Sequence, residues 1–197
     1  DGPTHQAIED FGIMRSIPNM TVIMPGDYYA VKKLVRKAAE MYGPVYLRFT
    51  RDSIPVIYTP EDEFEIGKGK RIKEGNDISI IAIGDMVYAA LQAAEKLNEM
   101  GISAEEIDMH TLKPLDADIV KEAIDKTGKI ITVEDHNIIN GLGSAISEVV
   151  AETGKGIVRR VGVNDTFAES GEYTLLLEKY GLDSNNIVIK AKEILRL

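Results

Sequence analysis

An aspartate and a histidine at the beginning of the chain are the first candidates for chemistry. Asp1 and His5 lie four residues apart in a short polar segment that also contains Gly2 and Pro3, and we expect this segment to be a loop. A carboxylate and an imidazole at this spacing can face one cleft, where the first accepts and the second donates hydrogen bonds. Loops are also polar because they face solvent, and the spacing alone favours this simpler interpretation.

Two arginines at the end of a predicted strand, Val45–Thr50, are the next candidates. Arg48 and Arg51 are three residues apart, so a regular strand turns them to opposite faces, and we expect only one of them to face a site. A guanidinium at a strand end suits a phosphate group. A surface ion pair is an equally good interpretation.

Two further histidines follow predicted strands. His110 comes after Ser103–Met109, and His136 lies in Val133-Glu134-Asp135-His136-Asn137, at an edge where α/β folds often bind ligands. For both, a hydrogen-bonded loop histidine is the favoured interpretation.

Recognised phosphate and zinc motifs are missing. Gly141-Leu142-Gly143 precedes a predicted helix, but position 146 is Ile where a dinucleotide fingerprint has its third Gly, so we expect only a tight turn. The sequence has no P-loop, and its histidines lack the paired spacing of a zinc site.

Composition narrows the function classes. The 197 residues are 44% apolar and 28% charged, which is typical of a folded globular chain. The net charge of −9 argues against a nucleic-acid or membrane surface, and no apolar stretch is long enough to cross a bilayer. The absence of Cys excludes thiol catalysis and suits a reducing compartment, so we expect a cytoplasmic protein.

The order of the predicted elements indicates an α/β fold. Strands and helices alternate after residue 65, as βαβ units with a mostly parallel sheet between two layers of helices require. The strands and helices expected there are Ile78–Ile83, a helix from Val87 to Leu97, Ser103–Met109, a helix from Asp116 to Lys126, Ile130–Val133, Ser144–Glu152, Ile157–Val163, Tyr173–Tyr180 and Ser184–Leu197. Thr21–Met24 and Val45–Thr50 are predicted strands, and Asp27 is predicted to cap a helix that reaches about Met41. Phe64–Ile72 alternates imperfectly and is a predicted connecting strand.

Prolines cluster before residue 61, and an acidic run follows them, which suggests a boundary near residues 55–65. We place one unit at 1–62 and a second at 63–197.

Several motifs, in order along the whole chain, resemble the transketolase family. They are Asp1-Gly2-Pro3-Thr4-His5-Gln6, Arg15-Ser16-Ile17-Pro18-Asn19-Met20, Gly43-Pro44-Val45, Thr50-Arg51, Gly84, Gly101-Ile102, Lys113-Pro114-Leu115-Asp116, Val133-Glu134-Asp135-His136, Gly141-Leu142-Gly143-Ser144-Ala145 and Gly162 to Gly171. The resemblance implies that 1–62 is the C-terminal part of a pyrimidine-binding α/β domain. It implies that 63–197 is a three-layer αβα transketolase C-terminal domain.

The resemblance also implies an activity. Family members transfer a two-carbon ketol unit from a ketose phosphate to an aldose phosphate, using thiamine diphosphate and Mg²⁺, in the pentose phosphate pathway. By family resemblance, Asp1 contacts a hydroxyl of the donor sugar, His5 hydrogen-bonds the donor near its reacting carbons, and Arg51 holds the substrate phosphate. We therefore expect Arg48 to turn away from the site.

The chain departs from the family pattern where the cofactor is held. The Gly-Asp-Gly motif that precedes a metal-binding Asn is missing, because Gly26-Asp27-Tyr28 and Gly84-Asp85-Met86 both lack the second Gly. The family's catalytic glutamate lies upstream of Asp1. We therefore expect cofactor and metal to be held by an N-terminal transketolase section, either on the same chain or as a separate subunit, in a homo-oligomer or heterotetramer.

Two alternatives remain open. The chain could belong to a 1-deoxyxylulose-5-phosphate synthase, which shares D-G-x-T-H and R-x-I-P-x-M, although its arginine usually lies in Tyr-Pro-Arg-Gly rather than in Phe49-Thr50-Arg51-Asp52. It could also be a non-catalytic assembly module. Because the sequence begins at Asp1 inside a motif, we expect residues before Asp1 to exist in the gene and to be disordered or removed.

Overall fold

A parallel sheet organises most of the molecule. The computed structural model describes residues 2 and 4–197. Its five-stranded sheet has the order β3-β5-β4-β7-β8. The strands β5, β4, β7 and β8 are mutually parallel, and β3 pairs antiparallel with β5 at one edge. The strand bounds are β3 Lys70–Lys73, β4 Ile78–Ala82, β5 Ala104–Asp108, β7 Lys129–Asn137 and β8 Ile157–Val163.

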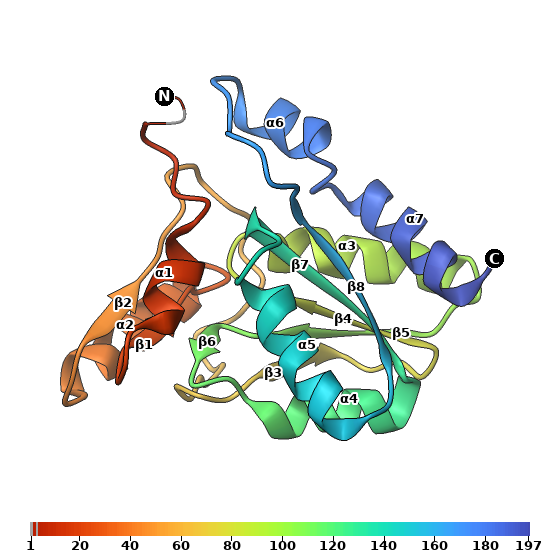
Figure 1. Ribbon diagram of the computed structural model, residues 1–197, viewed down its shortest axis with the longest axis horizontal. Coiled ribbons are helices and arrows are strands. Elements are labelled where there is room, and N and C mark those ends of the chain that lie inside the picture. The colour runs from red at the N-terminus through yellow and green to blue at the C-terminus, as the bar shows by residue number, and fades with distance from the viewer. Residues whose placement is uncertain (1, 3) are drawn as a thin grey trace.

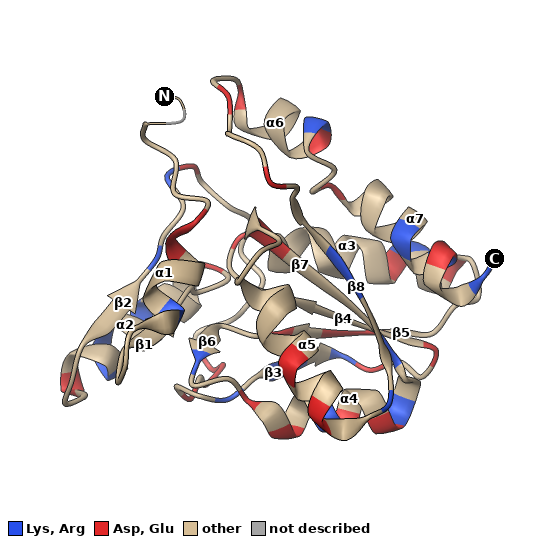
Figure 2. Ribbon diagram, in the orientation of Figure 1, with Lys and Arg blue, Asp and Glu red and all other residues tan. Residues whose placement is uncertain are grey.

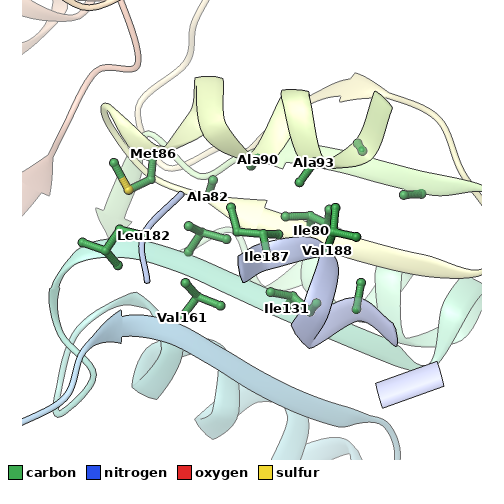
Figure 3. Close-up of a cluster of buried hydrophobic side chains, with 14 of the residues drawn as sticks. Ile80, Ala82, Met86, Ala90, Ala93, Ile131, Val161, Leu182, Ile187 and Val188 are labelled. Carbon is green, nitrogen blue, oxygen red and sulfur yellow. The ribbon is translucent and has the colours of Figure 1, made fainter. Parts of the chain in front are cut away.

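Helices cover both faces of this sheet, as Figure 1 shows. They are α3 Met86–Glu99 and α7 Ser184–Leu195 on one face, and α4 Ala117–Thr127 and α5 Leu142–Thr153 on the other. All five residues of β4 are buried, so successive side chains pack into separate hydrophobic cores on the two faces of the sheet. Ile80 and Ala82 pack with α3 and α7 (Figure 3), whereas Ile81 packs with α4 and α5. The three-layer arrangement expected from the sequence is confirmed.

A smaller, three-stranded sheet lies beside the first. Its order is β2-β1-β6, with β1 Thr21–Ile23 parallel to β2 Val45–Leu47 and antiparallel to β6 Thr111–Lys113. It carries α1 Asp10–Ser16 and α2 Tyr28–Glu40. Phe11, Val22 and Met24 share a hydrophobic core with the α4 and α5 face of the large sheet, which joins the two sheets through buried apolar surface.

Most predicted elements are present, with shifts at their ends. The strand expected over Val45–Thr50 stops at Leu47, and the connecting strand expected over Phe64–Ile72 is reduced to the short edge strand β3. Phe64 lies outside it and packs against the Tyr58 and His110 rings. The short elements α1 and β6 were not predicted. Helix α3 ends as expected, with Gly101 in a left-handed conformation (φ +80°) just beyond its C-cap, Met100.

Asp27 caps α2, as the sequence predicts, and also holds a second segment. One carboxylate oxygen accepts a hydrogen bond from the Ala30 amide, and the other accepts from the amides of Ile57 and Tyr58 at 2.9 and 2.8 Å. The Asp27 side chain is fully buried. Its three amide partners would have no acceptor without it.

Helix α6, Tyr173–Lys179, is attached to the rest of the fold through an apolar and a polar contact. It contains no fully buried residue, but Leu177 packs against the core of the α3 and α7 face. The Tyr173 hydroxyl donates a hydrogen bond to the carboxylate of Asp85, which follows β4. Burial, followed by repulsion from Asp135, raises the pKa of the Asp85 carboxyl to about 7.

Within residues 2 and 4–197, every helix is too short or too polar to cross a lipid bilayer.

The buried cap yields a stability prediction. Asp27→Ala leaves the buried amides of Ala30 and Tyr58 and the half-buried amide of Ile57 without their acceptor, so we expect the free energy of unfolding to fall by about 3 kcal/mol. Asp183 is the matched control, because it caps α7 through Asn185 and Asn186 in a more exposed setting, and Asp183→Ala should cost about 1 kcal/mol. Urea unfolding measures both. Equal costs would mean that the Ile57 and Tyr58 bonds contribute nothing.

The raised Asp85 pKa yields a pH prediction. Between pH 4 and pH 7 the folded chain holds a proton on Asp85 that the unfolded chain has released. The free energy of unfolding should therefore fall as pH rises, relative to Asp85→Asn, by up to about 1.4 kcal/mol per pH unit. Urea unfolding of the unchanged chain and of Asp85→Asn from pH 5 to pH 8 tests this. The other buried acids are present in both proteins, so their effects cancel in the difference. A difference that does not change with pH would contradict it.

Candidate functional site

His5 is exposed, at the end of the chain that lies near α6 in Figure 1. Its backbone amide donates to the Gly2 carbonyl at 2.8 Å, and its Nδ1 lies 3.0 Å from the Thr4 hydroxyl oxygen. These local contacts leave the imidazole accessible. Asp1, the carboxylate expected to work beside it, lies outside the described residues.

The segment that carries His5 is fixed to the C-terminal end of the large sheet. The Asn137 amide, at the end of β7, donates to the Ile8 carbonyl at 2.8 Å. The Gln6 side chain donates to the Glu169 carbonyl at 3.2 Å. A Cβ added to Gly2 would lie 2.6 Å from the Ser170 hydroxyl oxygen, so these two residues are in close contact. The 165–171 loop and β7 therefore support the segment from two sides.

Arg51 is exposed, as a residue that meets a substrate must be, whereas Arg48 is nearly buried. The sequence predicts that Arg48 turns away from the site by strand alternation, and this is wrong. Strand β2 ends at Leu47, so alternation does not govern the next residues. Arg48 instead turns toward the His5 segment and donates a hydrogen bond to the Ala7 carbonyl at 2.7 Å. Through this bond the structure brings the His5 and Arg51 segments together.

The Arg48 guanidinium lies among acidic groups from both sheets. Its Nε is 3.0 Å from the Asp10 carboxylate in α1, and its Nη1 donates to the Asp135 carboxylate in β7. Figure 2 shows these acidic stretches in red and the basic stretch after β2 in blue. Burial alone would lower the pKa of Arg48, but attraction to Asp135 and Asp10 outweighs it and raises that pKa. The arginine therefore stays charged.

An aromatic stack supports the same cluster. The Arg48 guanidinium lies 4.8 Å from the centre of the Phe11 ring, and the His136 ring stacks on Phe11 at 5.1 Å. Tyr46 adds a hydrogen bond from its hydroxyl to Asp10 at 2.8 Å, and burial followed by this bond raises the Tyr46 pKa to about 12.

Both downstream histidines are hydrogen-bonded, as the sequence predicts, but both are buried, and His136 lies within β7 rather than in a loop. His136 Nδ1 lies 2.6 Å from the Asn137 carbonyl, and Nε2 accepts from the Gly12 amide at 3.4 Å, so the ring is neutral with its proton on Nδ1. Burial lowers the His136 pKa, which agrees with this form. His110 Nε2 lies 3.0 Å from the Glu65 carbonyl. Within the described residues His110 Nδ1 has no hydrogen-bond partner, and it lies 3.9 Å from an Asp108 carboxylate oxygen.

Gly141 and Gly143 lie at the turn into α5, Gly141 as its N-cap and Gly143 in its first turn, and the start of this helix already holds a carboxyl group of the chain. The amides of Leu142 and Gly143 donate to the Glu134 carboxylate at 2.6 and 2.8 Å. A Cβ on Gly141 would lie 1.9 Å from a Glu134 oxygen, so only glycine fits. Burial raises the Glu134 pKa to about 8, against the opposing effect of these amides. The turn holds the chain's own carboxyl group where a phosphate could otherwise bind.

A hollow of about 440 Å³ lies between α1 and β6, apart from His5. The two basic side chains that line it already have partners within the chain. Arg15 forms an ion pair with Glu148, and Lys113 donates hydrogen bonds to the carbonyls of Arg15 and Ile17.

The described residues contain no group of three or more His, Cys, Asp or Glu that could hold a metal ion. The two Gly-Asp pairs have other roles. Asp27 caps α2, and Asp85 accepts a hydrogen bond from the Tyr173 hydroxyl.

Sequence reasoning missed the acids that organise this region. Asp135 lies in the Val133–His136 motif, which could have drawn attention to it. Asp10 gave no signal, because the helix that carries it was not predicted. Nothing in the spacing of Asp10, Arg48 and Asp135 indicates that they meet.

Two protein-family models match this chain. The family model described as "Transketolase, pyrimidine binding domain" matches residues 1–56, and "Transketolase, C-terminal domain" matches residues 67–187.

Similar proteins carry the same family name. A Methanocaldococcus jannaschii protein, provisionally named as a transketolase C-terminal section, is 49% identical over 98% of this chain and 61% of its own length. A 6-deoxy-6-sulfo-D-fructose transketolase subunit from a Clostridium species is 42% identical over 98% of this chain and 60% of its own length. The chain thus spans about three fifths of these curated relatives.

A solved structure of a split-gene transketolase, described as an inactive beta4 tetramer, matches all of this chain and 64% of its own with a TM-score of 0.94 and 44% identity. Together with the two family models, this shows that the chain belongs to the transketolase family and carries part of its pyrimidine-binding domain followed by its C-terminal domain.

Proposed function

We propose that this chain is the substrate-facing C-terminal section of a transketolase, active only with an N-terminal section. The complete enzyme would transfer a two-carbon ketol unit from a ketose phosphate to an aldose phosphate. The observation that carries this proposal is the ordered match to two transketolase domain models, which begins within the Asp1–His5 motif.

Two exposed residues would act on the substrate. His5 has an accessible imidazole on a segment held from two sides, so it would donate a hydrogen bond to the donor sugar near its reacting carbons. Arg51 lies three residues after the Arg48 link to that segment, and its guanidinium would bind the sugar phosphate by charge-assisted hydrogen bonds. Asp1 would contact a donor hydroxyl.

The cofactor would be held elsewhere. The transketolase family uses thiamine diphosphate, which supplies the carbon nucleophile when it is bound. This chain lacks the Gly-Asp-Gly motif, and the two Asp residues that come nearest to it are engaged within the described structure. Its own residues therefore do not fit the diphosphate and its Mg²⁺. We propose that the N-terminal section holds both, and that the sections assemble as an oligomer.

A second candidate is 1-deoxyxylulose-5-phosphate synthase. A protein of that name from Desulfotalea psychrophila is 36% identical over this whole chain and 32% of its own length. We favour transketolase because the 49% and 42% identical relatives carry that name, and because Arg51 lies in Thr50-Arg51-Asp52 rather than Pro-Arg-Gly.

The incomplete cofactor site yields the first functional prediction. The purified chain, supplied with thiamine diphosphate, Mg²⁺ and sugar phosphates, should show no ketol transfer, because it lacks residues for the diphosphate and the catalytic glutamate. Adding the N-terminal section should restore turnover, and His5→Ala should abolish most of it. Turnover by the chain alone would contradict the proposal. Full activity of the reconstituted His5→Ala enzyme would favour the assembly-module alternative.

The proposed role of Arg51 yields a second prediction. In the complete enzyme, Arg51→Ala should raise KM for phosphorylated sugars, at a cost of about 1.5–3 kcal/mol in kcat/KM. Unphosphorylated sugars should be nearly unaffected, because they lack the group that Arg51 binds.

Arg36→Ala, which removes an exposed arginine from α2, is the matched control and should change neither parameter. Arg48→Ala cannot serve as a control, because Arg48 contacts the His5 segment. Equal losses for phosphorylated and unphosphorylated sugars would show that Arg51 has a structural role instead.

A further inference from the structure

Four hydrogen bonds and an ion pair surround the Arg48 guanidinium, which carries five N–H donors in a planar fork. Its Nη1 donates to the Asp135 carboxylate and to the Met24 sulfur at 3.1 Å, and its Nη2 donates to the Ala7 carbonyl at 2.7 Å and to the Asp135 carbonyl at 3.3 Å. Its Nε forms an ion pair with the Asp10 carboxylate. No other side chain type offers five donors in one rigid plane.

These acceptors come from four separate pieces of the chain. Asp10 lies in α1, Met24 follows β1, Asp135 lies in β7, and Ala7 lies two residues after His5. Ile8 is buried in the core of the α3 and α7 face, whereas Ala7 is exposed and Gln6 half-buried. The apolar core therefore holds this stretch only at Ile8, and polar contacts hold the residues between Ile8 and His5.

Burial makes the cluster rigid. The exposed fractions are 10% for the Arg48 side chain, 9% for Asp10 and 19% for Asp135. In such a setting a lost partner leaves a buried charge uncompensated, so the guanidinium has one favourable position. The Ala7 carbonyl is held relative to that position. The Asn137 amide fixes the next carbonyl, that of Ile8, from the same strand end.

We propose that Arg48 is a positioning residue for the substrate-facing segment, and that it transmits the rigidity of the large sheet to His5. The catalytic consequence rests on the function proposed above. On this account the C-terminal domain contributes to the geometry of the site as well as to assembly.

Arg48→Lys tests the proposal, because an ammonium keeps the charge but cannot reach five acceptors. In the chain alone, amide hydrogen exchange should become faster in the 4–9 stretch and at Asn137, while β4 stays protected. In the complete enzyme, kcat should fall by roughly 10- to 100-fold, the scale of a misplaced catalytic group.

Arg15→Lys is the matched control. Arg15 also joins α1 to the large-sheet part of the molecule, through Glu148 on α5, and none of its contacts in the described structure involves the 4–9 stretch. We expect it to leave both exchange and kcat unchanged. If Arg48→Lys fails to fold, Asp135→Asn replaces it, since it weakens one partner while Asp10 still holds the guanidinium.

A double variant separates positioning from general support. If Arg48 acts through His5, the combined loss in Arg48→Lys/His5→Ala should be clearly smaller than the product of the two single losses. Losses that multiply fully, or unchanged exchange in the 4–9 stretch, would overturn the proposal. If His5→Ala alone has no effect, the proposed function fails, and the exchange measurement then decides the positioning role by itself.

Discussion

The buried guanidinium of Arg48 is the interaction on which the arrangement of the site region depends. It joins α1, β7, the end of β1 and the N-terminal segment in one cluster. Two carboxylates surround one cation, so the cluster has no stable form without the arginine: its removal leaves buried negative charges that repel each other. Conversely, the two acids compensate the charge of the arginine in this buried position. The cluster is therefore held together as a unit.

Apolar packing fixes the relative position of the two sheets that supply the residues of this cluster. Phe11, Val22 and Met24 share one core with residues of the α4 and α5 face, so the small sheet cannot move relative to the large one without exposing apolar surface. The Phe11 ring also contacts both the Arg48 guanidinium and the His136 ring. Hydrophobic burial fixes the two sheets and holds Ile8, and the polar cluster then holds the exposed part of the segment between Ile8 and His5.

The fold could be predicted from the sequence much further than the site. Continuous apolar runs such as Ile78–Ile83, and helices ended by Gly101 or Gly128, are local signals that survive folding. The Asp27 cap is equally local, whereas its bonds to Ile57 and Tyr58 are not. The Arg48 cluster joins residues up to 128 positions apart, from Ala7 to Asp135, and no periodicity encodes such a meeting. Strand alternation misassigned Arg48 because the strand ends one residue before it.

The C-terminal edge of the large sheet is the place where open α/β sheets usually bind ligands. In this chain, three acids at that edge already have partners from the chain itself: Asp85 accepts from Tyr173, Glu134 occupies the start of α5, and Asp135 holds Arg48. Each contact turns a position suited to a ligand into an attachment point for a neighbouring segment. The edge thus supports α6, α5 and the His5 segment, and the proposed substrate contacts lie one layer further out, on the segments that it holds.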